Sequence, residues 1–182
     1  MDFYLSTLMI YSLGGGTGSG LGSRILEEIS DNYGGNEIFN AAVFPTSNGE
    51  SPLQHYNCLF SLSKLQEFSD GVMYFCNDSI LNLLTYVFGK KITDNVINVT
   101  NINEYIASCL TSVLKINDSK GLNRMYGDII GEIIPNPNLK FFEVFASPYC
   151  CNRKMSSGPE STWEAVVNNC LRQMNNDEIE GK

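Results

Sequence analysis

Along most of the chain, short apolar runs alternate with segments whose apolar residues recur at helical spacing. Short apolar runs bounded by glycine, proline or polar turns predict buried strands at residues 4–11, 38–44 and 72–76. Apolar residues at helical spacing predict helices over residues 21–30, 52–66, 77–88, 102–114 and 163–174. Two shorter elements are also predicted, a helix at 123–133 and a strand of a further layer at 141–145.

Strands that alternate with helices predict an α/β fold, in which a parallel sheet carries helices on both faces. Sheets of this kind bind ligands at the carboxyl ends of their strands, in the loops that lead into helices. The loops after the three predicted strands are therefore the places where we expect a site.

A glycine-rich segment fills the first of these loops: Gly14-Gly15-Gly16-Thr17-Gly18-Ser19-Gly20, directly after Ser12 and Leu13. Five glycines in seven residues give up backbone entropy that a simple turn rarely needs to give up. Without side chains the main chain can approach an anion, and backbone N–H groups at a helix start attract it. Thr17 and Ser19 add hydroxyl donors. The spacing favours phosphate binding over the alternative, a tight turn packed through glycine.

Two familiar phosphate loops do not fit this glycine segment (residues Gly14–Gly20). A Walker loop needs Gly-Lys-Ser/Thr, whereas Gly20 is followed by Leu21 and Gly22 with no lysine. A dinucleotide fingerprint needs glycine at the first, third and sixth positions. Starting from Gly14 or from Gly18, the sixth position is a serine.

The segment does resemble the signature loop with which the tubulin and FtsZ superfamily wraps the phosphates of GTP. The resemblance extends over about residues 1–150 and includes Tyr56-Asn57, similar to the family's Tyr-Asn at the start of the helix after its ribose loop. It implies GTP or GDP as cofactor and places Asn77 and Asn103 where the family contacts the purine. An asparagine amide offers a donor and an acceptor to the guanine edge. The alternative for each asparagine is a helix cap.

Three features are similar to the delta branch of this superfamily. The ribose loop reads Phe44-Pro45-Thr46-Ser47-Asn48-Gly49-Glu50, Gln54 stands where alpha and beta chains carry glutamate, and residues 171–174 resemble a delta segment. Other minor branches of the gamma, epsilon or zeta type are the alternative.

The resemblance also implies a division into domains. Residues 1–116 would form part of a GTP-binding domain that ends in the central helix, and residues 117–182 would begin the intermediate α+β domain. Complete family members have further phosphate loops before the signature loop, so we expect a fragment truncated at both ends, with Mg²⁺ bound only in a longer protein. Val99 replaces the aromatic residue that stacks on the purine in alpha and beta chains.

Asp128 is the candidate catalytic residue, with Glu132 one turn further. In the family an acidic residue at this place completes the GTPase site of a neighbouring subunit, where a carboxylate can position the attacking water. The alternative is a pair of solvated surface acids. Any GTPase activity would be weak and would need a partner subunit.

Charge and composition exclude several other functions. The net charge of −8 and a pI near 4.6 repel phosphate backbones, so no nucleic-acid partner is expected. No run approaches the roughly 20 apolar residues that span a membrane, and no membrane partner is expected. Six scattered cysteines and a single histidine predict free thiols and no metal site within the chain.

The leading hypothesis is therefore a GTP-binding cytoskeletal subunit of the cytoplasm that associates head-to-tail with other tubulin subunits. The resemblance alone adds a place at the centriole or basal body and in microtubule organisation. A fragment that keeps the fold without binding nucleotide is the second hypothesis. The third, a small α/β enzyme for another phosphorylated ligand, lacks a plausible acid–base constellation.

Overall fold

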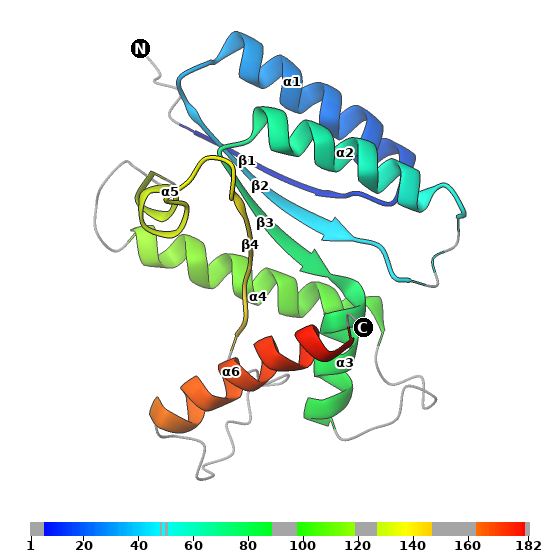
Figure 1. Ribbon diagram of the computed structural model, residues 1–182, viewed down its shortest axis with the longest axis vertical. Helices are drawn as coiled ribbons and strands as arrows, with labels where there is room; N and C mark the ends of the chain where they lie inside the picture. Colours follow the sequence, from blue (N-terminus) through cyan, green and yellow to red (C-terminus); the bar gives the residue numbers. More distant parts are fainter. Residues whose placement is uncertain are drawn as a thin grey trace. The chain divides into compact units, whose positions relative to one another are not determined.

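The chain forms two compact units in this computed structural model, which describes residues 6–47, 49, 51–88, 98–118, 127–146 and 163–180 (Figure 1). The first unit comprises residues 1–78 and 112–143, and the second comprises residues 79–111 and 144–182. The domain boundary near residue 116 stays a prediction.

The first unit contains a four-stranded parallel sheet in the order β1-β2-β3-β4, which confirms the predicted α/β class. Its strands are β1 (Ser6–Ser12), β2 (Glu37–Phe44), β3 (Gly71–Cys76) and β4 (Phe141–Glu143). The expectation that β4 belongs to a further layer is wrong, because Phe141 pairs with Val72 of β3. Joining the sheet lets Phe142 pack on Phe39, with ring centroids 5.6 Å apart.

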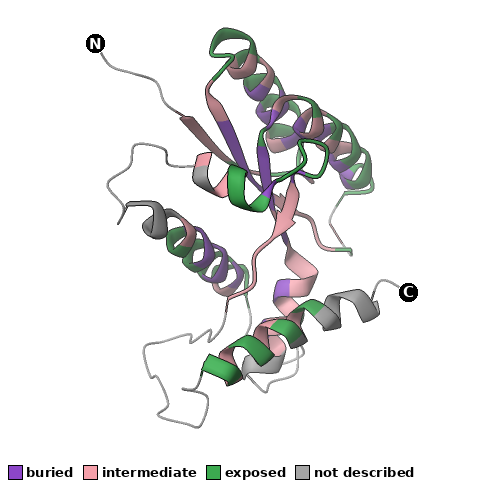
Figure 2. Cartoon of the chain, turned by 60° about the vertical axis from the view of Figure 1, so that its left-hand side comes forward, coloured by how far each residue is buried: buried purple, intermediate pink, exposed green. Residues whose placement is uncertain are grey.

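Two helices cover one face of this sheet (Figure 1). The first is η1 (Thr17–Gly22), a π-helical turn that continues into α1 (Ser23–Asn32), and the second is α2 (Gln54–Phe68). Their inner sides and most of β2 and β3 are buried, whereas β1 is mainly of intermediate exposure (Figure 2). This core contains Leu13, Leu26, Ile38, Ala42, Cys58, Leu65 and Val72. Helices on the second face stay a prediction, since α3 and α4 belong largely to the other unit.

A buried polar cluster lies where β3 and β4 begin. The Lys140 ammonium, 8% exposed, donates to the carbonyl oxygen of Ser69 at 2.5 Å. The Asn40 side-chain amide, fully buried, donates to the Ser69 hydroxyl at 2.7 Å. The cluster therefore joins residues of β2 and of the segments before β3 and β4, which ties the short strand β4 to the sheet.

The second unit is helical in its described part, with most of α3 (Asn77–Phe88) and α4 (Val99–Asp118), and with α6 (Trp163–Glu180). Helix α4 buries Ile102, Ile106, Cys109 and Leu110 of the predicted apolar stripe, and it also buries Tyr105. On α6, by contrast, a row of large apolar side chains is exposed: Trp163, Val167, Leu171 and Met174.

Helix α5 (Gly127–Ile133) belongs to the first unit and coincides with the C-terminal part of the helix predicted at 123–133. Residues 123–126 lie outside the described residues.

We predict that Lys140→Met destabilises the fold by about 1–3 kcal/mol, because the Ser69 carbonyl is left buried without its donor. Lys64→Met is the matched control: Lys64 forms its ion pairs with Glu27 and Glu67 at the surface, with its own side chain 40% exposed. Pairs of that kind contribute about 0–1 kcal/mol. Urea unfolding of both variants measures the difference, and equal losses would contradict the role given to Lys140.

Tyr11 predicts a pH dependence of stability. Its ring lies under Gly22, and its buried hydroxyl has no hydrogen-bond partner among the described residues. Burial raises the pKa of Tyr11 from 10.0 to about 12, an effect that the approach of Ser61 only partly offsets. Since the folded state holds the neutral form, this contribution is complete below pH 10 and is lost as pH rises from 10 to about 12.

In Tyr11→Phe this loss should disappear, so the variant should lose less stability than the wild type across that pH window. Urea unfolding at a series of alkaline pH values measures it. Parallel curves for the two proteins would show that Tyr11 does not titrate differently on folding.

Candidate functional site at the carboxyl edge of the sheet

The register of the parallel strands brings three chain segments to one edge of the sheet. Ser12 at the end of β1 pairs with Val43, and Val43 pairs with Phe75 near the end of β3. The glycine segment, the loop between β2 and α2, and Asn77 at the start of α3 therefore follow neighbouring strand ends. From β1 to β3 the distance is two strand spacings, about 10 Å.

The glycine segment forms a shorter loop than predicted. Only Leu13, Gly14 and Gly15 lie in the bend, Gly16 already has helical dihedral angles (φ −63°, ψ −36°), and η1 begins at Thr17. The expectation of a loop through Gly20 is wrong because Ser19 closes the turn early. Its backbone N–H and its hydroxyl both donate to the Gly15 carbonyl, at 3.0 and 2.7 Å.

No side chain caps the start of η1. The first N–H groups of a helix have no acceptor within the helix, so these donors are left for solvent or a ligand. Thr17 is exposed beside them, whereas Ser19 is buried with its hydroxyl hydrogen bonded to Gly15.

Packing explains only some of the glycines in this segment. A Cβ on Gly18 would collide with the backbone oxygen of Ser12, and one on Gly14 would lie 2.9 Å from the Pro45 side chain. A Cβ on Gly15, Gly16 or Gly20 would meet nothing within 4 Å. Among the described glycines, positive φ occurs only at Gly35, outside the segment. Neither contacts within the chain nor backbone conformation therefore accounts for Gly15, Gly16 and Gly20.

Hydrogen bonds hold the three segments of this edge together. The Asn57 side chain donates to the Gly14 carbonyl at 3.0 Å, and Gln54 donates to the Thr46 carbonyl at 3.1 Å. The Ser47 N–H donates to the Asp78 carboxylate at 2.6 Å, which links the β2–α2 loop to the start of α3. Sequence reasoning alone did not predict these roles. Their signal is a polar residue in the first turn of a helix that follows a strand.

The two candidate purine contacts have different surroundings. Asn77 is the first residue of α3, half-buried, and its amide makes no hydrogen bond to another described residue. Asn103 is exposed and is the fifth residue of α4, so it does not open that helix. Asn98 and Asn101 cap α4 by exchanging side-chain to backbone hydrogen bonds of 3.2 and 3.0 Å. The cap is therefore not the role of Asn103, and its proximity to the glycine segment stays a prediction.

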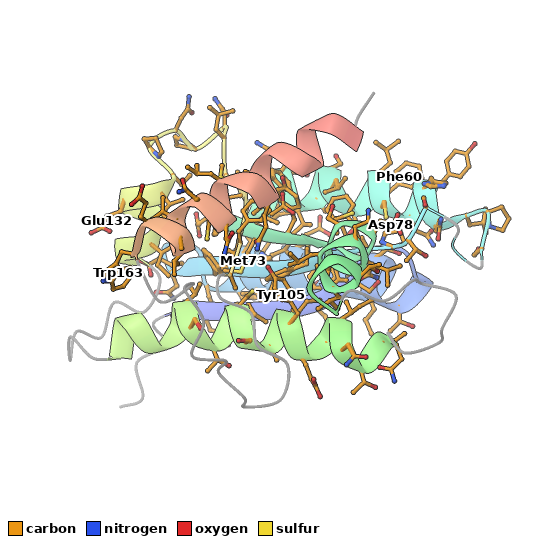
Figure 3. The ribbon with its side chains drawn as sticks, turned by 90° about the horizontal axis from the view of Figure 1, so that it is seen from below. Phe60, Met73, Asp78, Tyr105, Glu132 and Trp163 are labelled. Atoms are coloured by element: carbon orange, nitrogen blue, oxygen red, sulfur yellow. The ribbon has the colours of Figure 1, made fainter. Side chains whose placement is uncertain are left out.

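Helix α5, which carries Asp128, begins at the opposite edge of the sheet. A Cβ on Gly127 would meet the carboxylate of Glu37, the first residue of β2, and Ile134 lies against Gly71, the first residue of β3. The strand β2 has eight residues and spans roughly 25 Å. Figure 3 shows Glu132 of α5 and Asp78 at opposite ends of the sheet, with Met73 of β3 between them. The Asp128 side chain lies outside the described part.

The part of the chain that the structure describes offers neither a metal site nor a membrane span. Within it, no group of three or more His, Cys, Asp or Glu residues is arranged to hold a metal ion. The helices described there include none long and apolar enough to cross a membrane.

In this domain the first strand of a parallel sheet leads through a glycine-rich turn into a helix. These features define a nucleotide-binding α/β domain. Residues 1–85 match the Tubulin/FtsZ family, GTPase domain. The chain belongs to the tubulin superfamily.

Its relatives include tubulin gamma and delta chains. The chain is 35% identical to the tubulin gamma chain of Eremothecium gossypii over 144 residues, which cover 78% of the chain and 29% of that relative. It is 29% identical to the human tubulin delta chain over 178 residues, which cover 95% of the chain and 38% of that relative. The mouse tubulin delta chain is 28% identical over 171 residues, covering 91% of the chain and 36% of its own length. The chain thus spans about a third of the length of these relatives.

Gly18, which packs against backbone, and Gly16, which faces open space, should respond to substitution with opposite changes in stability. Gly18→Ala should destabilise the fold by about 1–3 kcal/mol, because the backbone oxygen of Ser12 cannot move aside cheaply. Gly16→Ala should stabilise it by about 0.4–1 kcal/mol, because alanine fits the helical dihedral angles and restricts the unfolded chain. Thermal unfolding of the two variants measures both changes. A Gly16→Ala loss as large as that of Gly18→Ala would show that Gly16 is needed for packing.

Proposed function

We propose that the chain binds a guanine nucleotide, GTP or GDP, at the carboxyl edge of its sheet, with the phosphates over the glycine segment. The observation that carries the proposal is that Gly15, Gly16 and Gly20 face open space and have helical or otherwise ordinary backbone angles. Side chains there would disturb nothing in the chain but would occupy the space of a ligand. The match of residues 1–85 to a GTPase-domain family indicates that this ligand is a guanine nucleotide.

Particular groups of this edge would hold the nucleotide. Backbone N–H groups of the glycine segment, with Thr17 and the exposed end of β1 at Ser12, would donate to phosphate oxygens. Asn77 would contact the purine through its amide, and Asn103 would do so if α4 lies alongside. We propose that Mg²⁺ binds with the phosphates only in the full-length protein.

Asp128 would act on the nucleotide of a second subunit. Helix α5 lies at the amino edge of the sheet and the glycine segment lies at the carboxyl edge, a strand length apart. The same chain cannot bring both together, whereas a head-to-tail neighbour can. We therefore propose association with other tubulin subunits and, at most, a weak GTPase that depends on that contact.

The delta branch is the more specific proposal. Similarity to delta chains extends over 95% of this chain, against 78% for the gamma chain, although identity to the gamma chain is higher. The wider coverage favours a delta-type cytoskeletal subunit over a gamma-type one or another minor tubulin. A place at the centriole, basal body or cilium follows only from that branch and is proposed with it.

A nucleotide-free interaction fragment is the second candidate. The exposed apolar row on α6, from Trp163 to Met174, favours it because such a face is suited to contact with another chain. The exposed Val99, in place of a stacking aromatic residue, also weakens base binding.

Titration calorimetry with GTP on the isolated chain distinguishes the two candidates. These 182 residues span about a third of the relatives' length and would supply part of their nucleotide contacts, so we expect a dissociation constant near millimolar. Each missing charge-assisted hydrogen bond costs on the order of 1.5–3 kcal/mol, or about one to two decades of affinity. Micromolar binding would show that further contacts are dispensable, and no binding up to several millimolar would favour the interaction fragment.

Gly16→Leu tests where the phosphates bind. It should abolish the binding without unfolding the chain, because its side chain enters the open space over the segment. Gly131→Leu is the matched control: Gly131 is a helical glycine of α5 that also faces open space, away from this edge. Retained binding in Gly16→Leu would move the phosphate site elsewhere.

A further inference from the structure

Asn57 connects helix α2 to the main chain of the glycine segment. The residue lies in the first turn of α2 and is half-buried, and its side-chain Nδ2 donates to the Gly14 carbonyl oxygen at 3.0 Å. The bond joins residues 43 positions apart, so it belongs to the tertiary fold and is not a local turn. The starts of η1 and α2 lie at the same edge of the sheet (Figure 1).

This bond fixes the direction of the peptide group between Gly14 and Gly15. In a trans peptide the C=O and the following N–H point in opposite directions. Because the Gly14 carbonyl points to α2, the Gly15 N–H points away from α2. Gly15 is exposed, and its N–H makes no hydrogen bond to another described residue. The donor is therefore free and faces the open side of the segment.

The alternative orientation of this peptide is easily reached. Both flanking residues are glycines, which adopt either sign of φ at little cost. A flipped peptide would point the Gly14 carbonyl oxygen, a partial negative charge, to the open side. An anion at that place would then meet a repulsive oxygen where it otherwise meets a donor.

We propose that Asn57 is a positioning residue for the phosphate site: its amide holds the Gly14–Gly15 peptide so that the Gly15 N–H donates to a phosphate oxygen. This inference rests on the proposed function and adds to it a residue that does not touch the nucleotide. A residue with this role affects the binding of the phosphates and leaves the binding of the base unchanged.

The test compares GTP with guanosine, which has the same base and no phosphate, in the full chain. NMR titration, suited to weak binding, gives the ratio of the two affinities. In Asn57→Ala this ratio should fall about tenfold or more, the value of one charge-assisted hydrogen bond, while guanosine binding stays unchanged. In Asn57→Asp the side chain has the same shape but ends in a carboxylate that cannot donate, so the affinity ratio should fall at least as far. Asn57→Gln, which keeps the amide, should recover part of the ratio.

Asn32→Ala is the matched control. The Asn32 side chain also donates to a backbone carbonyl, that of Glu28 at 2.7 Å, but at the end of α1. It should leave the ratio unchanged. The Gly15 amide resonance gives a second readout, since titration with inorganic tripolyphosphate should shift it in the wild type and in Asn32→Ala but not in Asn57→Ala.

The outcomes separate this inference from the proposed function. No GTP response in the wild type would overturn both. A wild type that binds GTP, with Asn57→Ala keeping its affinity ratio within twofold, would overturn the positioning role alone. Equal losses for GTP and guanosine would also overturn it, because they would show that Asn57 only supports the fold. If Asn57→Ala does not fold, the Asn57→Asp and Asn57→Gln pair decides in the same way.

Discussion

The parallel pairing of β1, β2 and β3 is the constraint on which the rest of the first unit depends. Their register is continuous, from Ser6 opposite Glu37 to Phe44 opposite Cys76. Because all strands point the same way, every strand-to-helix turn falls at one edge and every helix-to-strand return falls at the other. Residues 38–42 of β2 are all buried, but only Ile38 and Ala42 belong to the core with Leu26 of α1 and Leu65 of α2, so a slip by one residue would turn these two away from α1 and α2. Burial of one sheet face thus fixes which loops can share a ligand.

The glycine segment meets two demands that oppose each other. At Gly18 the absent side chain lets η1 start against the backbone oxygen of Ser12, which serves packing. At Gly15 and Gly16 the absent side chains leave space that the fold does not use, at the cost of the entropy that glycine loses on folding. A sequence selected for stability alone would place alanine there. Stability given up beside an uncapped helix start is characteristic of a binding site.

Sequence periodicity was sufficient for the elements with strong patterns. It predicted β2, β3 and the buried face of α4, because long apolar runs and stripes leave little choice of burial. It failed where tertiary contacts decide. The strand β4 is three residues long, and only its partner β3 defines its layer. The glycine segment becomes helical early because the Ser19 hydroxyl and N–H converge on one carbonyl. The peptide held by Asn57 depends on residues 43 positions apart, which no local pattern reveals.

On the proposed function, the two edges of the sheet explain why one subunit would not suffice for hydrolysis. The glycine segment and α5 are separated by the length of a strand, and the strands cannot shorten without losing their core residues. A site completed from another subunit then joins the carboxyl edge of one copy to the amino edge of the next. Such a contact uses two different surfaces, so it leaves a free edge at each end of any pair. Unless rotation closes a ring, the association continues as a linear array. On this proposal the polarity of the parallel sheet would be passed on to the assembly.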